Sequence, residues 1–270
     1  MNKTILITGA SSGIGKATAK YFQEKGWNIV ATMRTPDKEK ELTELENVLV
    51  TRLDVLDKES IKDAVRKGIE RFVKIDVLLN NAGYGAYGIL EAASDENITR
   101  QFNTNVIGLL FVTREVLPHF RQNKDGIIIN ISSIGGKITI PLGTLYHGTK
   151  FAVEGLSEAL HYEMETIGVK VKIVEPGVVA TDFTSRSLDM FMNPKLKEYM
   201  PIIQKMMELR QAGAGYKSEP KIIAEVIYEA ATDGSDKMRY PAGDDAVKII
   251  GNRDKWDDEM YFTEWKKQFD

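Results

Sequence analysis

Tyr146 and Lys150 stand four residues apart in a stretch of helical length, so their side chains are expected on one face of a helix. An ammonium group beside a phenol lowers the pKa of the phenol from about 10 towards neutrality. A tyrosine in that state can exchange a proton with the oxygen of a carbonyl or an alcohol. By itself the pair is a weak signal, and its meaning depends on where the helix lies.

Ser133 stands thirteen residues before Tyr146 and directly after an apolar, β-branched run at residues 126–132. That run is predicted to be a buried strand. Ligands of open α/β sheets bind beyond the carboxyl ends of the strands. A serine hydroxyl at that edge could donate a hydrogen bond to a substrate oxygen, which gives the Tyr–Lys pair a chemical setting.

A glycine-rich segment, Thr8 to Gly15, follows the first predicted strand and opens the first predicted helix. Glycines permit a tight turn and let the backbone approach a pyrophosphate, while the helix N-terminus supplies N–H groups and partial positive charge. The spacing Gly-x-x-x-Gly-x-Gly differs from the usual Gly-x-Gly-x-x-Gly, and glycines also occur in such turns without a ligand. Its place between strand and helix favours a dinucleotide site.

The end of the second predicted strand, residues 28–32, indicates which nicotinamide dinucleotide would bind. Met33 and Arg34 follow this strand, and no carboxylate comes before Asp37. An acidic residue there would hold a ribose 2′-hydroxyl, whereas an arginine would pair with a 2′-phosphate. The sequence therefore favours NADP(H) over NAD(H), although an exposed arginine with no ligand is a common alternative.

Short apolar runs alternate with segments of helical length through the first two thirds of the chain. Strands are predicted at residues 4–8, 28–32, 48–53, 76–80, 126–132 and 169–175, and helices at 16–25, 58–72, 98–120 and 146–166. Gly26 would end the first helix and Asp57 would cap the second. Strands separated by helices imply a parallel sheet with helices on both faces. The prediction is an α/β fold, a doubly wound (Rossmann-like) sheet in a single domain over residues 1–270.

The pattern changes after Pro176. Residues 183–215 lack a strand-like run and carry Phe183, Leu188 and many methionines among charges. Pliable, methionine-rich surface suits a small helical lid over an apolar ligand, and two ordinary packed helices are the equal alternative. Pro220 is expected early in a further helix. The aromatic tail, which includes Trp256 and Phe269, is expected to form a surface helix or an oligomer contact.

Composition excludes several classes of protein. The 270 residues include 36 Lys and Arg against 39 Asp and Glu, for a formal charge of −3, which argues against binding nucleic acid. There is no cysteine and there are three histidines, so no metal site is expected. No run approaches the ~20 apolar residues of a membrane span, and the first strand reaches Gly9 too soon for a signal peptide. A cytoplasmic protein is the expectation.

Taken in order, these motifs resemble the short-chain dehydrogenase/reductase family. The resemblance covers residues 3–182 strongly, and it is carried by the following residues: Thr8-Gly9-x-x-x-Gly13-x-Gly15, Asn80-Asn81-Ala82-Gly83, Asn105, Ser133, Tyr146-x-x-x-Lys150 and Pro176-Gly177. Met33 and Arg34 look most like the NADP-using, hydroxysteroid-dehydrogenase-like members. The family implies a hydride-transferring oxidoreductase acting on a carbonyl or secondary alcohol, and the apolar lid favours a hydrophobic substrate. Relatives in the family are usually homodimers or homotetramers through helices corresponding to 98–120 and 146–166.

The resemblance also implies a role for each matching residue. Tyr146 would be the general acid or base, Lys150 would lower its pKa and bind the nicotinamide ribose, Ser133 would polarise the carbonyl, and Asn105 would hold a water in a proton relay. Asn80 may be structural instead, bridging strands. The residues implied to bind the cofactor are Gly9, Ser11, Ser12, Gly13, Ile14, Gly15, Arg34, Asp54, Val55, Asn81, Ala82, Gly83, Tyr146, Lys150, Pro176, Gly177, Val179 and Thr181.

Several readings compete with this one. A protein of the same fold could bind the dinucleotide as a sensor or scaffold without turnover, but such proteins tolerate loss of the Tyr or Lys, and neither is lost here. Enoyl reductases have a wider Tyr–Lys spacing. His147 is expected to point about 100° away from Tyr146 and to serve packing or surface. Asp54 could be a carboxylate satisfied by backbone donors, and residues 37–46 are expected to form a solvated helix.

Overall fold

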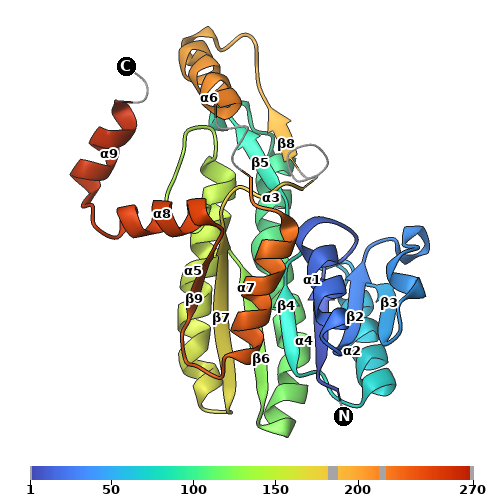
Figure 1. The fold of residues 1–270 in the computed structure, drawn as a ribbon. Helices are drawn as coiled ribbons and strands as arrows, with labels where there is room; N and C mark the ends of the chain where they lie inside the picture. The colour runs from blue at the N-terminus through green and yellow to red at the C-terminus, as the bar shows by residue number, and fades with distance from the viewer. Residues whose placement is uncertain (1, 182–187, 213–216, 268–270) are drawn as a thin grey trace.

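The computed structural model describes residues 2–181, 188–212 and 217–267. Within this part of the chain, seven strands form one parallel sheet in the order β3-β2-β1-β4-β6-β7-β9 (Figure 1). The strands are β1 Thr4–Thr8, β2 Asn28–Met33, β3 Val48–Arg52, β4 Val77–Asn80, β6 Gly126–Ile131, β7 Val169–Pro176 and β9 Arg239–Ala242. The doubly wound sheet is confirmed, and the six predicted strands differ from the observed ones only at their ends. β9 was not predicted.

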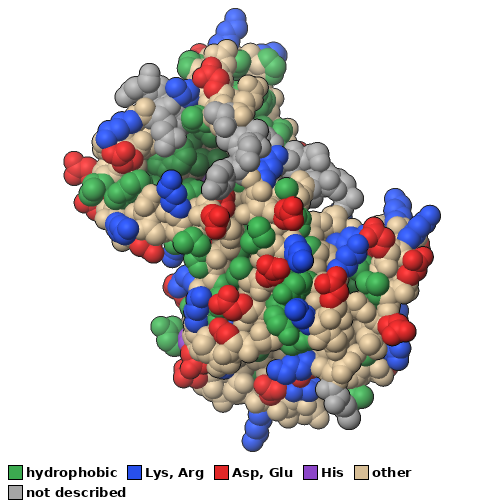
Figure 2. All heavy atoms as spheres, in the orientation of Figure 1, with side chains coloured by type: hydrophobic (Ala, Val, Ile, Leu, Met, Phe, Trp, Pro, Cys, Tyr) green, Lys and Arg blue, Asp and Glu red, His purple; other side chains and the backbone are tan. Residues whose placement is uncertain are grey.

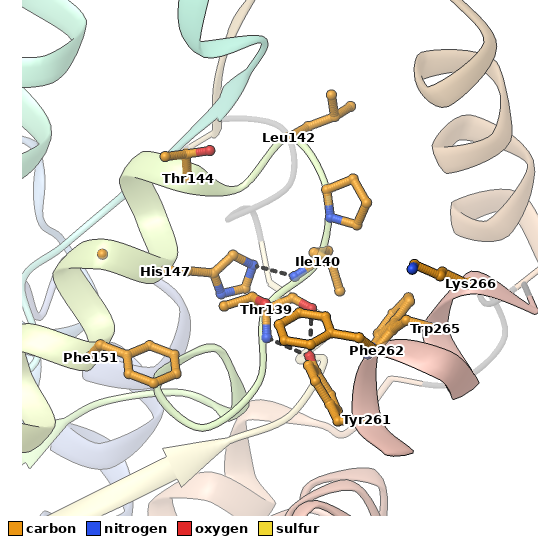
Figure 3. A pocket seen from close by; sticks show the side chains of 12 residues that line it. Thr139, Ile140, Leu142, Thr144, His147, Phe151, Tyr261, Phe262, Trp265 and Lys266 are labelled. Atoms are coloured by element: carbon orange, nitrogen blue, oxygen red, sulfur yellow. Dashed lines mark hydrogen bonds between the residues drawn. The ribbon is translucent and has the colours of Figure 1, made fainter. Parts of the chain in front are cut away.

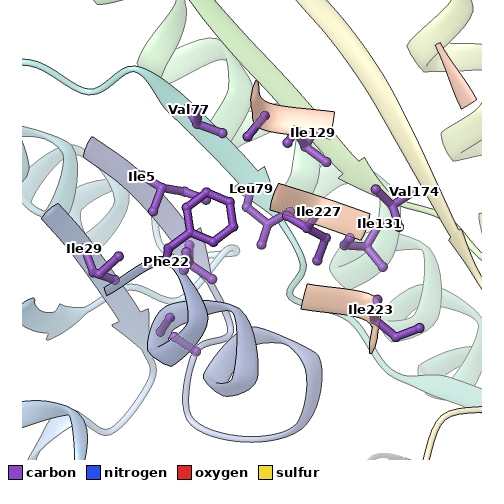
Figure 4. Close-up of a cluster of buried hydrophobic side chains, with 14 of the residues drawn as sticks. Ile5, Phe22, Ile29, Val77, Leu79, Ile129, Ile131, Val174, Ile223 and Ile227 are labelled. Carbon is purple, nitrogen blue, oxygen red and sulfur yellow. The ribbon is translucent and has the colours of Figure 1, made fainter. Parts of the chain in front are cut away.

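Helices cover both faces of this sheet. Helices α1 (Gly13–Glu24) and α7 (Pro220–Thr232) lie on one face, and α2 (Lys58–Phe72), α4 (Gly108–Asn123) and α5 (Thr144–Glu165) lie on the other. In β1, Ile5 and Ile7 pack into the core with Phe22 of α1 and Ile227 of α7, whereas Leu6 packs into the opposite core (Figure 4). Because both faces of each strand are buried, the strands read as continuous apolar runs.

Local sequence signals set the ends of several helices. The carboxylate of Asp57 accepts hydrogen bonds from the N–H groups of Glu59 and Ser60 at 3.1 and 3.2 Å, which confirms the predicted cap of α2. Gly26 follows α1 with a left-handed φ of +80°. Pro220 is the first residue of α7, where its missing N–H costs no hydrogen bond.

The predicted helix at 98–120 is present but divided. It comprises α3 (Asp95–Phe102), a π-helical turn (Asn103–Ile107) and α4. Asn105 lies within the π-helical turn and is buried. Such turns are rare and are often found at functional sites.

The solvated helix expected at residues 37–46 is wrong. The chain forms two short 3₁₀ turns there, Pro36–Lys38 and Leu42–Glu44, and both Leu42 and Glu39 are buried. The Glu39 carboxylate accepts hydrogen bonds from the N–H groups of Glu41 and Leu42 and pairs with Lys16 of α1 at 3.1 Å. The helix that the charge pattern suggested does not form, because the observed turns bury Leu42 and allow Glu39 to pair with Lys16.

A small second sheet lies beyond the carboxyl edge of the main one (Figure 1). It pairs β5 (Gly85–Gly88) with β8 (Leu188–Phe191), so the expectation that residues 183–215 contain no strand is wrong. Helix α6 (Met200–Ala212) follows, so the helix expected within residues 183–215 is present. Phe183 and Phe269 lie outside the described residues. The C-terminal segment forms α8 (Asp244–Arg253) and α9 (Asp258–Lys266), and none of the described helices is long and apolar enough to cross a membrane.

A buried chain of side-chain amides and hydroxyls crosses the middle of the sheet. The Asn80 amide nitrogen donates to Asn130 Oδ1 and to Thr113 Oγ1, both at 2.9 Å, and the Asn130 amide donates to Ser157 Oγ at 2.8 Å. These contacts join β4 to β6, α4 and α5. They support the structural alternative for Asn80, which bridges neighbouring strands.

We expect Asn80→Ala to lower the free energy of unfolding by about 2–4 kcal/mol, because buried acceptors on Asn130 and Thr113 lose their donor. Thr113→Val is the milder comparison and should cost about 1 kcal/mol, since the Asn80–Asn130 hydrogen bond survives. Urea denaturation of the two variants and the wild type measures both effects. Equal stabilities for all three proteins would contradict the structural role of Asn80.

Candidate active site

Ser133 and Tyr146 form a hydrogen-bonded pair at the carboxyl end of β6. Each side chain is 8% exposed. Ser133 Oγ accepts a hydrogen bond from the Gly135 N–H at 3.0 Å and donates one to the Tyr146 hydroxyl. Two candidate residues that stand thirteen positions apart in the sequence are thereby in direct contact. One substrate oxygen could accept hydrogen bonds from both hydroxyls.

The charge balance around Tyr146 differs from the expected one. Burial raises the pKa of Tyr146, and the hydrogen bond from Ser133 only partly opposes this. Lys150 was expected to lower that pKa, but its Nζ donates to the Ile131 carbonyl at 2.8 Å and lies 5.8 Å from the centre of the Tyr146 ring. The buried tyrosine is therefore held in its protonated, neutral form.

Lys150 is buried as well, and burial lowers its pKa to about 8, with Glu154 acting in the opposite direction. The ammonium form consequently predominates at neutral pH and is lost as the pH rises through that value. Glu154, one helical turn further along α5, is buried and accepts a hydrogen bond from Arg239 of β9 at 3.0 Å. Lys150 thus carries a positive charge at neutral pH close to the Tyr146 ring, where negative charge would develop if the tyrosine lost its proton.

The Asn105 side chain is engaged with protein groups. Its amide oxygen accepts from the Tyr84 N–H at 3.0 Å, and its amide nitrogen donates to the Tyr84 carbonyl at 2.9 Å and to Thr149 Oγ1 at 3.1 Å. These bonds tie the residue before β5 to helix α5, one turn from Tyr146. The water contact implied for Asn105 stays a prediction.

The glycine loop is as tightly folded as a pyrophosphate site requires. Gly9 and Gly13 have φ values of +70° and +54°, and a Cβ on Gly15 would lie 2.4 Å from the Gly9 carbonyl oxygen. Thr8 Oγ1 accepts hydrogen bonds from the N–H groups of Asn81 and Ala82, both at 3.0 Å. Residues 81–83 therefore lie directly against the loop, as expected. Ser11, Ser12 and Ile14 complete the turn into α1, whose first turn contains no acidic residue that would repel a phosphate.

The residues expected around the adenosine half follow neighbouring strands. Arg34 comes directly after β2 and Asp54 soon after β3, and the Leu53 N–H donates to the Met33 carbonyl at 2.9 Å. Arg34 is exposed and belongs to none of the ion pairs formed among the described residues. The Asp54 carboxylate accepts from the Leu56 N–H at 3.0 Å, and Val55 is buried. Both the binding role of Asp54 and the local, structural one remain compatible with this geometry.

The segment from Pro176 to Thr181 runs beside the glycine loop. The Gly177 N–H donates to the Ala242 carbonyl at 3.1 Å, and the Ala180 N–H donates to the Ser218 carbonyl at 2.8 Å. A Cβ on Gly13 would lie 3.2 Å from the Thr181 methyl group. Val179 forms an isolated parallel bridge with Ser218. The glycine loop and the segment from Pro176 to Thr181 therefore meet at one edge of the sheet, and the tight glycine cradle fits a dinucleotide.

Sequence reasoning missed Asp245, which holds this segment from α8. Asp245 Oδ2 accepts a hydrogen bond from the Val178 N–H at 2.7 Å, and a Cβ on Gly177 would lie 2.2 Å from the same carboxylate. The sequence offered only an acidic pair at the start of a helix, which is an ordinary feature of helix N-termini. Its contact with residues 177–178 depends on the tertiary fold.

An apolar groove of about 760 Å³ lies between α9, the first turns of α5 and the loop after Ser133. Figure 3 shows Phe262 and Trp265 of α9 facing Ile140 of that loop. The Tyr261 hydroxyl donates to the Thr139 carbonyl at 2.7 Å and accepts from its N–H at 2.8 Å, which fixes α9 to the loop. His147 lines the groove and is buried, which excludes the surface position that was the alternative to packing. No group of three or more His, Asp or Glu in the described part of the chain could hold a metal ion.

We expect Asp245→Ala to weaken binding of the dinucleotide by about fivefold, because the solvent-exposed Val178 N–H loses an acceptor worth about 1 kcal/mol. Asp245→Asn keeps an acceptor oxygen at the same position and should retain most of the affinity. Titration of the reduced dinucleotide, followed by its fluorescence, measures both variants. An Asp245→Ala protein that binds like the wild type would show that the contact does not shape the site.

Comparison with known proteins agrees with this geometry. The family described as short chain dehydrogenase matches residues 3–190. An uncharacterised oxidoreductase of Schizosaccharomyces pombe is 50% identical over 236 residues, which cover 87% of this chain and 99% of the relative. A 3-ketodihydrosphingosine reductase of Bacteroides thetaiotaomicron is 44% identical over 180 residues, covering 67% of this chain and 65% of that protein.

Solved structures point the same way. A short-chain dehydrogenase from Streptomyces avermitilis superposes with a TM-score of 0.83 at 31% identity and covers 98% of this chain and 96% of its own. The structure of ElxO with NADP bound has a TM-score of 0.73 at 28% identity and covers 88% of this chain and 97% of its own. A nicotinamide dinucleotide is therefore the cofactor class that these neighbours support, and the chain belongs to the short-chain dehydrogenase/reductase family of NAD(P)-dependent oxidoreductases.

Proposed function

We propose that this protein interconverts a carbonyl group and a secondary alcohol on a hydrophobic substrate, with NADP(H) as the preferred cofactor. The observation that carries the proposal is the buried hydrogen bond from Ser133 to Tyr146, with Lys150 over the tyrosine ring and the glycine cradle at the same edge of the sheet. Carbonyl reduction needs a hydride at carbon and a proton at oxygen. The glycine loop would hold the dinucleotide that supplies the hydride, and Tyr146 would supply the proton.

When bound, the reduced nicotinamide supplies the hydride to the carbonyl carbon. Tyr146 donates its phenolic proton to the substrate oxygen as negative charge develops there. The Ser133 hydroxyl turns from Tyr146 to the same oxygen and orients it. The Lys150 ammonium stabilises the tyrosinate that remains, and in the reverse direction it favours the deprotonated tyrosine that must act as base. Because burial holds free Tyr146 protonated, the resting site is set for reduction.

Exposed Arg34 supports the preference for NADP(H). Its guanidinium follows β2, where the fold presents the adenosine ribose, and the first carboxylate after it along the chain is that of Asp37. Among the described residues it has no ion-pair partner that a 2′-phosphate would have to displace. Whether this chain lies in the hydroxysteroid-dehydrogenase-like branch stays a prediction.

The apolar groove supports a hydrophobic substrate. Its lining is dominated by Ile140, Leu142, Phe151, Phe262 and Trp265, and it includes His147, whose ring centre lies 5.7 Å from that of Tyr146. Figure 2 shows hydrophobic side chains gathered in the hollow between α9 and α6. The Bacteroides relative is named as a reductase of 3-ketodihydrosphingosine, a ketone on a long alkyl chain. A ketone or aldehyde joined to an extended apolar group is the substrate class we propose.

The organisation of the molecule is part of the same proposal. The described part of residues 183–215 exposes Met190, Met200 and Met207, and α6 stands beside the hollow, which suits a lid over an apolar ligand. Phe102 on α3 and Tyr162 on α5 are exposed as well, which suits association into a homodimer or homotetramer through these two helices. We treat the chain as one catalytic domain because the described helices α1, α2, α4, α5 and α7 pack on a single sheet.

Tyr146→Phe should reduce the rate of NADPH oxidation with a bulky apolar ketone by about 10²–10⁴-fold, because the phenylalanine ring has no proton to give. NADPH binding should persist. Tyr162→Phe is the matched control on the exposed part of α5, and it should leave turnover unchanged. A panel of ketones and aldehydes monitored by NADPH absorbance is the measurement. Tight NADPH binding without turnover on any substrate would favour the sensor or scaffold alternative.

Arg34→Ala combined with Met33→Asp should shift the cofactor preference towards NADH. The variant loses a charge-assisted contact to the 2′-phosphate, worth about 1.5–3 kcal/mol, and gains a carboxylate that repels it. The ratio of kcat/KM for NADPH to that for NADH should fall by about tenfold or more. An unchanged ratio would refute the assignment of Arg34.

A further inference from the structure

His147 adjoins Tyr146 in sequence, and its ring lies edge to face against the Tyr146 ring, with the ring centres 5.7 Å apart. It is 5% exposed, and both of its ring nitrogens contact the loop that follows Ser133. Nδ1 lies 2.9 Å from the Gly135 carbonyl oxygen, and Nε2 accepts the Ile140 N–H at 3.2 Å, the contact drawn as a dashed line in Figure 3. One imidazole therefore spans the loop from its first turn to its middle.

These two partners fix the state of the ring. A backbone N–H can only donate, so Nε2 must be the acceptor, and Nδ1 must carry the hydrogen that the Gly135 carbonyl accepts. That arrangement exists only for a neutral imidazole with its proton on Nδ1. Burial lowers the pKa of His147, which keeps this form at neutral pH.

The Gly135 contact leads directly to the reacting hydroxyls. The Gly135 N–H donates to Ser133 Oγ at 3.0 Å, and Ser133 in turn donates to Tyr146. The turn has little spare room, because a Cβ on Gly135 would lie 3.0 Å from His147 Nδ1 and 3.1 Å from Tyr146 Cε1. A ring that holds the Gly135 carbonyl therefore also fixes the direction of the N–H that aims the Ser133 hydroxyl.

The Ile140 contact leads to the apolar groove instead. Ile140 and Leu142 line the groove, and Figure 3 shows Ile140 facing α9. Gly143 closes the loop against the same ring, since a Cβ there would lie 2.3 Å from His147 Cδ2. The two nitrogens of one side chain thus contact the two parts of the loop that have separate tasks.

We propose that His147 is a positioning residue for the carbonyl reaction: Nδ1–H holds the turn that orients Ser133, and Nε2 holds the wall of the substrate groove. The proposal rests on the proposed function, because it assigns His147 to the same Ser133–Tyr146 site. It goes beyond packing, since it predicts that the two ring nitrogens affect different kinetic constants.

Two amide variants separate the two contacts. In His147→Asn the short side chain places its amide near the position of Nδ1, so it can donate to the Gly135 carbonyl but not reach Ile140. In His147→Gln the amide reaches the position of Nε2 and can accept from Ile140 while the Gly135 contact is lost. His147→Phe keeps the ring and removes both hydrogen bonds, and His161→Phe on the same helix is the control.

The expected results differ between the variants. His147→Gln should lower kcat by about tenfold or more with little change in KM, because a misplaced Ser133 loses orientation in the transition state. His147→Asn should mainly raise KM for bulky apolar carbonyls, and His147→Phe should do both. His161→Phe should match the wild type, and NADPH affinity should be preserved in all four proteins. If kcat fell and KM rose to the same extent in both amide variants, the proposal that Nδ1 and Nε2 affect different kinetic constants would be overturned.

A spectroscopic measurement on the wild-type protein tests the contacts without turnover or mutation. Long-range ¹H–¹⁵N NMR of the three histidines, assigned by single substitutions, should show His147 as the neutral Nδ1–H tautomer at pH 7. The Nε2–H tautomer or a charged ring would overturn the proposal for His147 and leave the proposed function intact. A wild-type protein that binds NADPH but reduces no carbonyl would overturn the proposed function, and the positioning role with it.

Discussion

A parallel sheet brings the carboxyl ends of all its strands to one edge, and each part of the candidate site depends on that. The glycine loop follows β1, Arg34 follows β2, Asp54 follows β3, Asn81 follows β4, Ser133 follows β6 and Gly177 follows β7. Segments separated by more than a hundred residues in the chain are adjacent there because register and direction are common to every strand. The geometry that results is fixed by backbone hydrogen bonds, and loops need to supply only the functional groups.

Buried polar contacts then hold the edge against the tendency of loops to move. Thr8 Oγ1 accepts hydrogen bonds from two N–H groups of the segment after β4, and the Asn105 amide both accepts from and donates to the backbone of Tyr84. A buried donor or acceptor without a partner costs about 1–3 kcal/mol, so each of these contacts disfavours any rearrangement that would break it. The site is thereby preorganised by side chains that need not touch the substrate.

Desolvation opposes charge on both members of the Tyr–Lys pair. It raises the pKa of Tyr146 and lowers that of Lys150, so each group is closer to neutral than its exposed counterpart. In this state the tyrosine retains its proton. The lysine remains mostly charged at neutral pH because burial lowers its pKa only to about 8. The proton that a substrate oxygen would receive is therefore present on Tyr146, although the raised pKa makes the phenol a weaker acid and leaves its transfer dependent on the Lys150 charge. Desolvation outweighs the other influences on Tyr146 here, the Lys150 ammonium donates to the Ile131 carbonyl, and its expected lowering of the tyrosine pKa stays a prediction.

Short-range pattern was enough to predict the doubly wound sheet, the Asp57 cap, the glycine loop and the Ser133, Tyr146 and Lys150 set, because these depend on periodicity, turn chemistry and the common edge of parallel strands. Pairing of β5 with β8, burial of Glu39 and Leu42, the reach of Asp245 to Val178 and the docking of Tyr261 on Thr139 were decided by the tertiary structure alone. Each of these joins residues whose local sequences fit an ordinary loop or surface helix equally well. Their conformations are selected by partners distant in the chain, and the free energy of those contacts exceeds the weak local preferences.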